Sequence, residues 1–105
     1  MEGVELSPGV ARAARQFSGV NGGILSDPRF RLTLADGRSF LRASAAGFDL
    51  IVSQPSNPWV AGVTNLFTRE FFHLARARLN PGGAVGIWVQ GYAMSAADFR
   101  SIVAT

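Results

Sequence analysis

The sequence predicts an α/β fold in which helices cover a parallel β-sheet. Segments with strand character alternate along the chain with segments that begin at helix-capping residues, and the strand segments are nearly continuous apolar runs. This alternation is typical of a parallel sheet whose faces are covered by helices. The chain has 105 residues, of which 48% are hydrophobic and 16% charged, and no repeat or linker divides it. We therefore expect one domain over residues 1–105.

The first predicted strand is a short apolar segment at residues 4–6, and a helix follows it. Ser7 is suited to cap this helix, and Pro8 fits its first position because the N–H that proline lacks would have no partner there. We expect glycines 19, 22 and 23 to end the helix and begin a loop. The apolar stripe of this helix consists of Val10, Ala14 and Phe17.

The second strand is predicted at residues 30–34, where apolar residues alternate with Arg31 and Thr33. Asp36 and Gly37 interrupt this strand, and Asp36 is a suitable N-cap for a short helix over residues 38–45. Residues 48–52 are the clearest buried strand. A loop over residues 54–64 should follow it, since this segment holds two prolines and a glycine.

Thr68 is predicted to cap the next helix, which residues 80–83 end with the sequence NPGG. We expect another strand over residues 84–90. The last helix should begin at Ser95, with Asp98 completing its cap, and run to Thr105. The apolar side of the helix after Thr68 consists of Phe71, Phe72, Ala75 and Leu79.

Ligands of open α/β sheets bind beyond the carboxyl ends of the strands, which directs attention to the residues that follow each strand. Glu5 is placed either to accept hydrogen bonds from ribose hydroxyls or to interact with the N-terminus of the helix after it. Asp36 is placed either to cap a helix or to accept from an adenine amino group. The segment QPSNPW at residues 54–59 either presents amides and an indole to a ligand, or is a structural loop whose tryptophan is packed.

Several other functions find no support in the sequence. No residues have zinc-ligand spacing, no nucleophile elbow is present, and no glycine cluster matches a phosphate-binding loop. His73 is interpreted as a surface residue. All ten basic residues are arginines spread along the chain, so we expect no nucleic-acid partner despite the net charge of +3. No apolar run approaches the roughly 20 residues that span a bilayer, and cysteine is absent, so we expect a cytoplasmic protein.

Five segments resemble the spermidine synthase-like family of aminopropyltransferases. They are VELSP at residues 4–8, LADGRSFL at 34–41, FDLIV at 48–52, LFTREFF at 66–72 and LNPGG at 79–83. The segments SNPW at 56–59 and WVQGY at 88–92 are most similar to a bacterial branch that is often fused to membrane segments. The resemblance implies the class I S-adenosylmethionine-dependent methyltransferase fold, a Rossmann-like parallel sheet with helices on both faces.

The resemblance also implies roles for individual residues. Glu5 would hold the ribose hydroxyls of an S-adenosyl-type donor, and Asp36 with Gly37 would meet its adenine. Gln54 stands where the family has a catalytic aspartate, and an amide cannot act as a base. Asn57 replaces a second family aspartate, so the loop lacks both charges that attract a polyamine. We assign Gln54 and Tyr92 to the catalytic set, and the substrate-binding set consists of Asn57, Trp59 and Gln90.

The parent function that the resemblance implies is aminopropyl transfer from decarboxylated S-adenosylmethionine to a small amine. Methyl transfer from S-adenosylmethionine is one alternative, and an inactive packing or dimerisation module is the other. The resemblance places the family's first core strand and glycine-rich donor loop before Val4, so we expect a truncated domain that is inactive by itself. The S-adenosyl-type donor is assigned to the parent, and this chain either still binds it or holds none. The open strand edges left by that missing strand predict a homo-oligomer.

Overall fold

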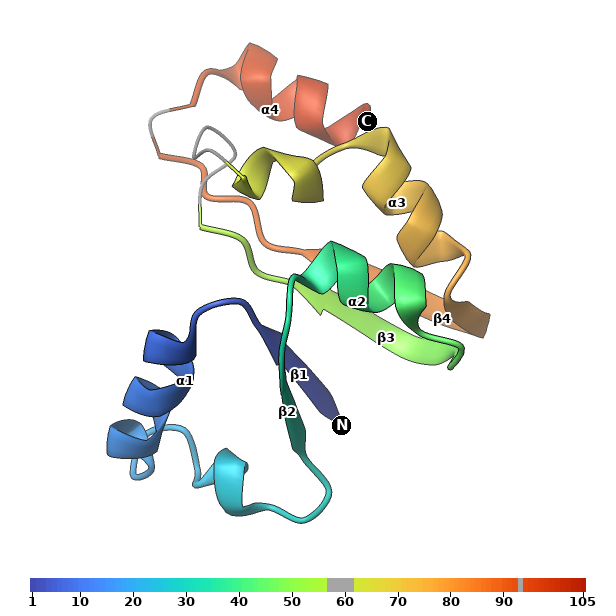
Figure 1. Cartoon of the computed structure of the whole chain (residues 1–105). Coiled ribbons are helices and arrows are strands. Elements are labelled where there is room, and N and C mark those ends of the chain that lie inside the picture. Colours follow the sequence, from blue (N-terminus) through green and yellow to red (C-terminus); the bar gives the residue numbers. More distant parts are fainter. Residues whose placement is uncertain (57–61, 93) are drawn as a thin grey trace. The chain divides into compact units, whose positions relative to one another are not determined.

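The chain is seen in a computed structural model that describes residues 1–56, 62–92 and 94–105, and it divides into two compact units, Met1–Ala43 and Ser44–Thr105. Each unit contains a two-stranded parallel sheet, β1 with β2 in the first and β3 with β4 in the second (Figure 1). The mixture of helices and parallel strands confirms the predicted α/β class. In the described residues the hydrogen-bonded strands form these two pairs, where the sequence had predicted one sheet.

In the first unit, β1 (Glu2–Glu5) pairs with β2 (Arg31–Leu34), and Glu5 lies opposite Leu34. Helix α1 (Pro8–Ala13) follows β1 and continues as a 3-10 turn, Ala14–Phe17. The predicted cap is confirmed, because the Ser7 hydroxyl accepts the Val10 N–H at 3.4 Å and proline occupies the first turn.

The apolar stripe of α1 is not buried, which corrects the sequence-based expectation. Val10 is 54% exposed and Phe17 60% exposed, and α1 has no buried residue. The side of α1 that lines a hollow with β2 instead carries Ala11 and Arg12. A sheet of two strands is too narrow to cover every apolar position of the helix beside it.

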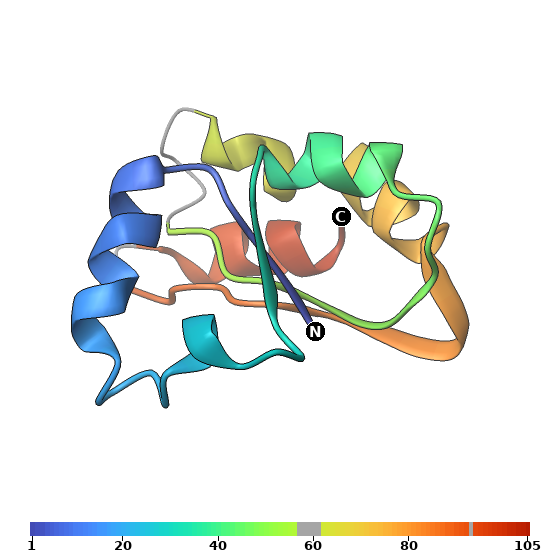
Figure 2. The ribbon, with the colours of Figure 1, turned by 60° about the horizontal axis from the view of Figure 1, so that its bottom comes forward.

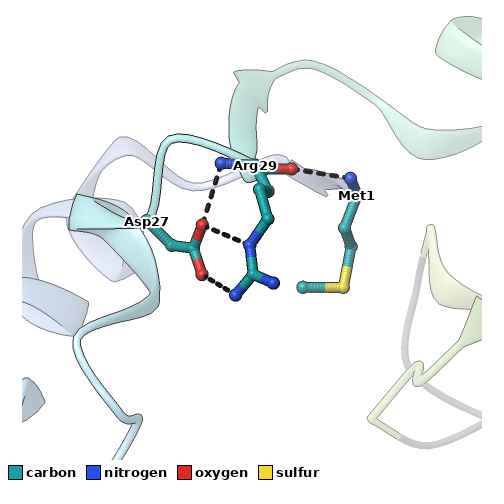
Figure 3. A network of polar contacts seen from close by, with 3 residues as sticks. All are labelled: Met1, Asp27 and Arg29. Atoms are coloured by element: carbon teal, nitrogen blue, oxygen red, sulfur yellow. Dashed lines mark hydrogen bonds and ion pairs between the residues drawn. The ribbon is translucent and has the colours of Figure 1, made fainter.

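The connection back to β2 is fixed by polar contacts near the amino ends of the two strands (Figure 3). The Asp27 carboxylate accepts the backbone N–H of Arg29 at 2.8 Å and pairs with its guanidinium at 2.7 Å. The amino group of Met1 donates to the Arg29 carbonyl at 2.7 Å. A 3-10 turn, Ile24–Ser26, precedes this network. Gly22 and Gly23, directly before the turn, have positive φ angles of 67° and 65°.

Helix α2 (Gly37–Ala43) begins after β2 and places Leu41 in the core, with 6% of its surface exposed. Asp36 caps this helix as predicted. Its Oδ1 accepts the Ser39 N–H at 2.8 Å, and its carbonyl accepts the Phe40 N–H at the same distance. The helix ends at Ala43 instead of at the predicted Ala45.

In the second unit, β3 (Phe48–Ser53) runs parallel to β4 (Leu79–Ile87), and Figure 2 shows the two segments side by side. The prediction that β4 would cover residues 84–90 was wrong at both ends. A register shift between Phe48 and Leu50 admits the NPGG segment into the strand, and Gly82 adopts a positive φ of 82° there. The Asn80 side chain also donates to Asp49 Oδ1 at 2.9 Å, which ties this segment to β3.

Helix α3 (Arg69–Arg76) follows a 3-10 turn, Val63–Leu66, and begins at the predicted cap, where Thr68 Oγ1 accepts the Phe71 N–H at 3.2 Å. Phe71 and Ala75 form the core of this unit with Phe67. Leu79, expected on the apolar side of this helix, instead begins β4.

Helix α4 (Ala96–Val103) carries the predicted capping box, in which Ser95 and Asp98 each accept the backbone N–H of the other. It ends at Val103, short of the predicted Thr105. Among the described residues, no helix has the length and apolar character needed to cross a membrane.

Candidate functional site

Glu5 and Asp36 follow the carboxyl ends of neighbouring strands in the first unit. Glu5 is the last residue of β1, and its carbonyl accepts the N–H of Ala35, directly before Asp36, at 3.0 Å. Since β1 and β2 are parallel, both carboxylates belong to the same edge of this small sheet. The structure therefore brings together the two acids that the sequence predicted for nucleoside binding.

The Glu5 carboxylate is half-buried and turns toward the start of α1, where its Oε1 accepts the Ser7 N–H at 2.7 Å. This contact is the structural role that the sequence left open beside ribose binding. A carboxylate has two oxygens and about four acceptor positions, so one hydrogen bond leaves capacity for a diol.

The Asp36 carboxylate is exposed, and the Ser39 side chain and backbone N–H that donate to it lower its pKa below the ordinary value. The positive charges of Arg38 and Arg42 lower this pKa further. Asp36 is consequently ionised at neutral pH and acts only as an acceptor. Gly37 next to it begins α2, and a Cβ placed there would meet no atom within 4 Å, so the space beside this backbone is open.

Arg38 and Ser39 also belong to this edge, although neither was predicted as a site residue. Ser39 is at the third helical position after the Asp36 cap, where the capping rule itself predicts a contact. Arg38 differs, because its Nε is buried and has no hydrogen-bond partner among the described residues. No local pattern indicates such a nitrogen, since its burial depends on packing.

Gln54, Gln90 and Tyr92 follow the corresponding edge of the second unit. Trp88 N–H donates to the Ser53 carbonyl at 2.9 Å, so the segments after β3 and β4 leave the sheet together. Gln54 and Tyr92 are exposed and Gln90 is half-buried. Pro55 is buried directly after Gln54 and anchors the start of the loop. The predicted substrate residues Asn57 and Trp59 lie outside the described residues.

The predicted residues thus form two sets, each within one unit: Glu5 with Asp36 and Gly37, and Gln54 with Gln90 and Tyr92. His73 is exposed on α3, in agreement with its interpretation as a surface residue. In the described parts of the chain, no cluster of three or more histidine or acidic side chains could hold a metal ion. The chemistry available at both edges is hydrogen bonding by carboxylates, amides and a phenol.

Comparison with known proteins gives consistent matches. The family described as "Spermine/spermidine synthase domain" matches residues 2–102. A polyamine aminopropyltransferase of Enterobacter sp. (strain 638) is 41% identical over 81 residues, which are 76% of this chain and 28% of that protein. Polyamine aminopropyltransferases of Escherichia coli O139:H28 and of the K12 strain DH10B are each 38% identical over 81 residues, again 76% of this chain and 28% of the relative. The chain spans about 28% of the length of these curated relatives.

Proposed function

Because the chain belongs to the spermine/spermidine synthase domain family, we propose that residues 1–105 form part of one Rossmann-like alkyl-transfer domain. The parent reaction is aminopropyl transfer from decarboxylated S-adenosylmethionine to a small amine, as the names of the relatives suggest. The observation that carries the proposal is the common edge of Glu5 and Asp36, which are joined through the 3.0 Å hydrogen bond between Ala35 and Glu5. We place this reaction in the cytoplasm.

The residues of the first unit fit the donor because a nucleoside presents hydrogen-bond donors to them. Glu5 would accept from the two ribose hydroxyls, and Asp36 would accept from the adenine amino group while it retains the Ser39 contact. Each carboxylate keeps unused acceptor positions, which suit the hydroxyl and amino groups of a nucleoside. A phosphate, which is itself an anionic acceptor, would be disfavoured beside them. When bound, the donor supplies an electrophilic carbon beside its sulfonium.

The residues of the second unit would act on the acceptor amine. The Gln54 and Gln90 carbonyl oxygens and the Tyr92 hydroxyl can accept hydrogen bonds from an amine and orient it. Gln54 cannot take the proton that the amine loses, because an amide is not a base at neutral pH. We therefore expect this chain to form no spermidine above background from decarboxylated S-adenosylmethionine and putrescine.

Methyl transfer is a second candidate function, favoured by the amide-proline pair Gln54-Pro55 directly after β3. An amide oxygen and a backbone carbonyl held by a buried proline can fix a target nitrogen without supplying a negative charge. The donor would then be S-adenosylmethionine itself, held by the same acids, Glu5 and Asp36.

Calorimetric titration of the chain with three nucleosides tests the proposal. We expect saturable binding of methylthioadenosine, the nucleoside that remains after aminopropyl transfer, and tighter binding of decarboxylated S-adenosylmethionine than of S-adenosylmethionine. The opposite order of the two donors would favour methyl transfer. Absence of binding by all three would overturn the nucleoside site and leave a module that functions only in packing.

A further inference from the structure

A hollow in the first unit lies between α1, the 3-10 turn after it and β2, and its lining includes none of the groups assigned above. Its volume is about 320 Å³, within the range of small-molecule sites. Its walls include the apolar residues Ala11, Leu25, Leu32 and Leu34, together with Arg12 and Arg15. Leu32 and Leu34 are two positions apart on β2, so both contribute to the same face of the sheet.

The two arginines give this apolar hollow a positive rim. They are three positions apart along a continuous helical segment, a spacing that places both side chains on one side. Two arginines of this unit differ from them by having acidic partners, since Arg29 pairs with Asp27 at 2.7 Å and Arg31 with Glu2 at 2.5 Å. None of the hydrogen bonds or ion pairs found in the described part of the chain engages the side chain of Arg12 or Arg15.

A second hollow of about 460 Å³ shares Arg15 and Leu25 with the first, so the two adjoin at these residues. Its other walls include Ser18, Asn21 and Ser26, which are polar. The Asn21 amide is held in place by its contact with the Ala14 carbonyl at 2.7 Å. The first hollow therefore contributes an apolar wall with Arg12, the second contributes polar groups, and Arg15 lines both.

We propose that this pair of hollows binds a small organic carboxylate with an apolar tail. The carboxylate would pair with the guanidinium groups of Arg12 and Arg15, whose planar geometry matches it, and the tail would lie on Leu25, Leu32 and Leu34. Two neighbouring cations repel an amine, so this site is distinct from that of the acceptor in the proposed reaction. The inference does not depend on the nucleoside site.

Titration with hexanoate at low ionic strength, followed by backbone amide chemical shifts, tests the proposal on the unsubstituted chain. We expect saturable shifts confined to residues of α1, the 3-10 turns and β2. Acetate, which lacks the tail, and hexanol, which lacks the charge, should each bind at least about tenfold more weakly. Hexylamine should produce no saturable shift.

Single-charge variants provide the matched comparison. Arg12→Gln and Arg15→Gln should each weaken hexanoate binding about tenfold, because each removes one charged partner of the carboxylate. Arg100→Gln on α4 removes the same charge from the other unit and should leave the affinity unchanged, with circular dichroism checking that every variant is folded. An equal loss in Arg100→Gln, or equal binding of hexanoate and acetate, would overturn the proposal.

Discussion

At the scale of single residues, Asp36 combines a structural contact that is visible with a ligand contact that we propose. Its Oδ1 accepts the Ser39 N–H at 2.8 Å. Serine caps helices about as well as aspartate, so Asp36→Ser should leave the unfolding free energy nearly unchanged while it removes the charge. We expect Asp36→Ser to weaken methylthioadenosine binding by roughly ten- to a hundredfold. Calorimetry measures the affinity, and urea unfolding measures the stability.

Asp36→Ala, in contrast, removes both the charge and the helix cap. It should weaken methylthioadenosine binding and also lower the free energy of unfolding by about 1 kcal/mol. Asp98→Ser is the control: it removes a carboxylate from the first turn of α4, in the other unit, and should leave the affinity unaltered. If Asp36→Ser bound methylthioadenosine as tightly as the unsubstituted chain, Asp36 would be only a helix cap.

The residues that the sequence predicted correctly are those whose partners are near in the chain. The caps Ser7, Asp36, Thr68 and Ser95 each bond an N–H three positions later, so local sequence determines them. The buried Nε of Arg38 and the exposed side chain of Phe17 depend on which segments pack nearby, and no local pattern contains that information. The roles of Glu5 and Gln54 toward ligands remain predictions.

At the scale of elements, β4 shows how a local rule is overridden. Proline and paired glycines ordinarily separate elements, and on that basis the sequence predicted a strand beginning at Ala84. The register shift against β3 accommodates the extra residues of the NPGG segment. The backbone at Gly83 can approach neighbouring carbonyl oxygens closely because glycine has no side chain. A Cβ at Gly83 would lie 3.0 Å from the carbonyl oxygens of Phe48, Asp49 and Asn80.

This close approach predicts that Gly83→Ala destabilises the second unit. Backbone oxygens cannot move aside as a flexible side chain would, so we expect a loss of about 1–3 kcal/mol in the free energy of unfolding. Gly86→Ala is a matched control in the same strand, because a Cβ there would meet no atom within 4 Å. Urea unfolding of both variants measures the difference. Equal stability of the two variants would show that the register shift does not require glycine.

At the scale of the whole molecule, apolar surface remains uncovered on β3, which the sequence predicted to be buried, and at Trp88 directly after β4. Leu50 is 61% exposed, Val52 69% and Trp88 57%. Leu50 and Val52 are two positions apart and therefore on one face of β3, opposite Ala84 and Gly86 of β4. Within the described ranges, every strand has a hydrogen-bonded neighbour on one side only. Two-stranded sheets of this kind are marginal by themselves in water, and their free edges favour pairing with another chain.

We therefore predict that the chain associates with itself at micromolar concentration, through the Leu50–Val52 face of β3 or its free edge. Light scattering should give a mass of at least twice the 11.2 kDa of one chain. Val52→Lys places a charge on this face and should shift the population toward the single chain. Val103→Lys, at a residue of α4 that is 70% exposed, adds the same charge elsewhere and should leave the mass unchanged. An 11.2 kDa species with cooperative unfolding would instead show that the sheet face and the strand edges are tolerated in water, and the prediction would fail.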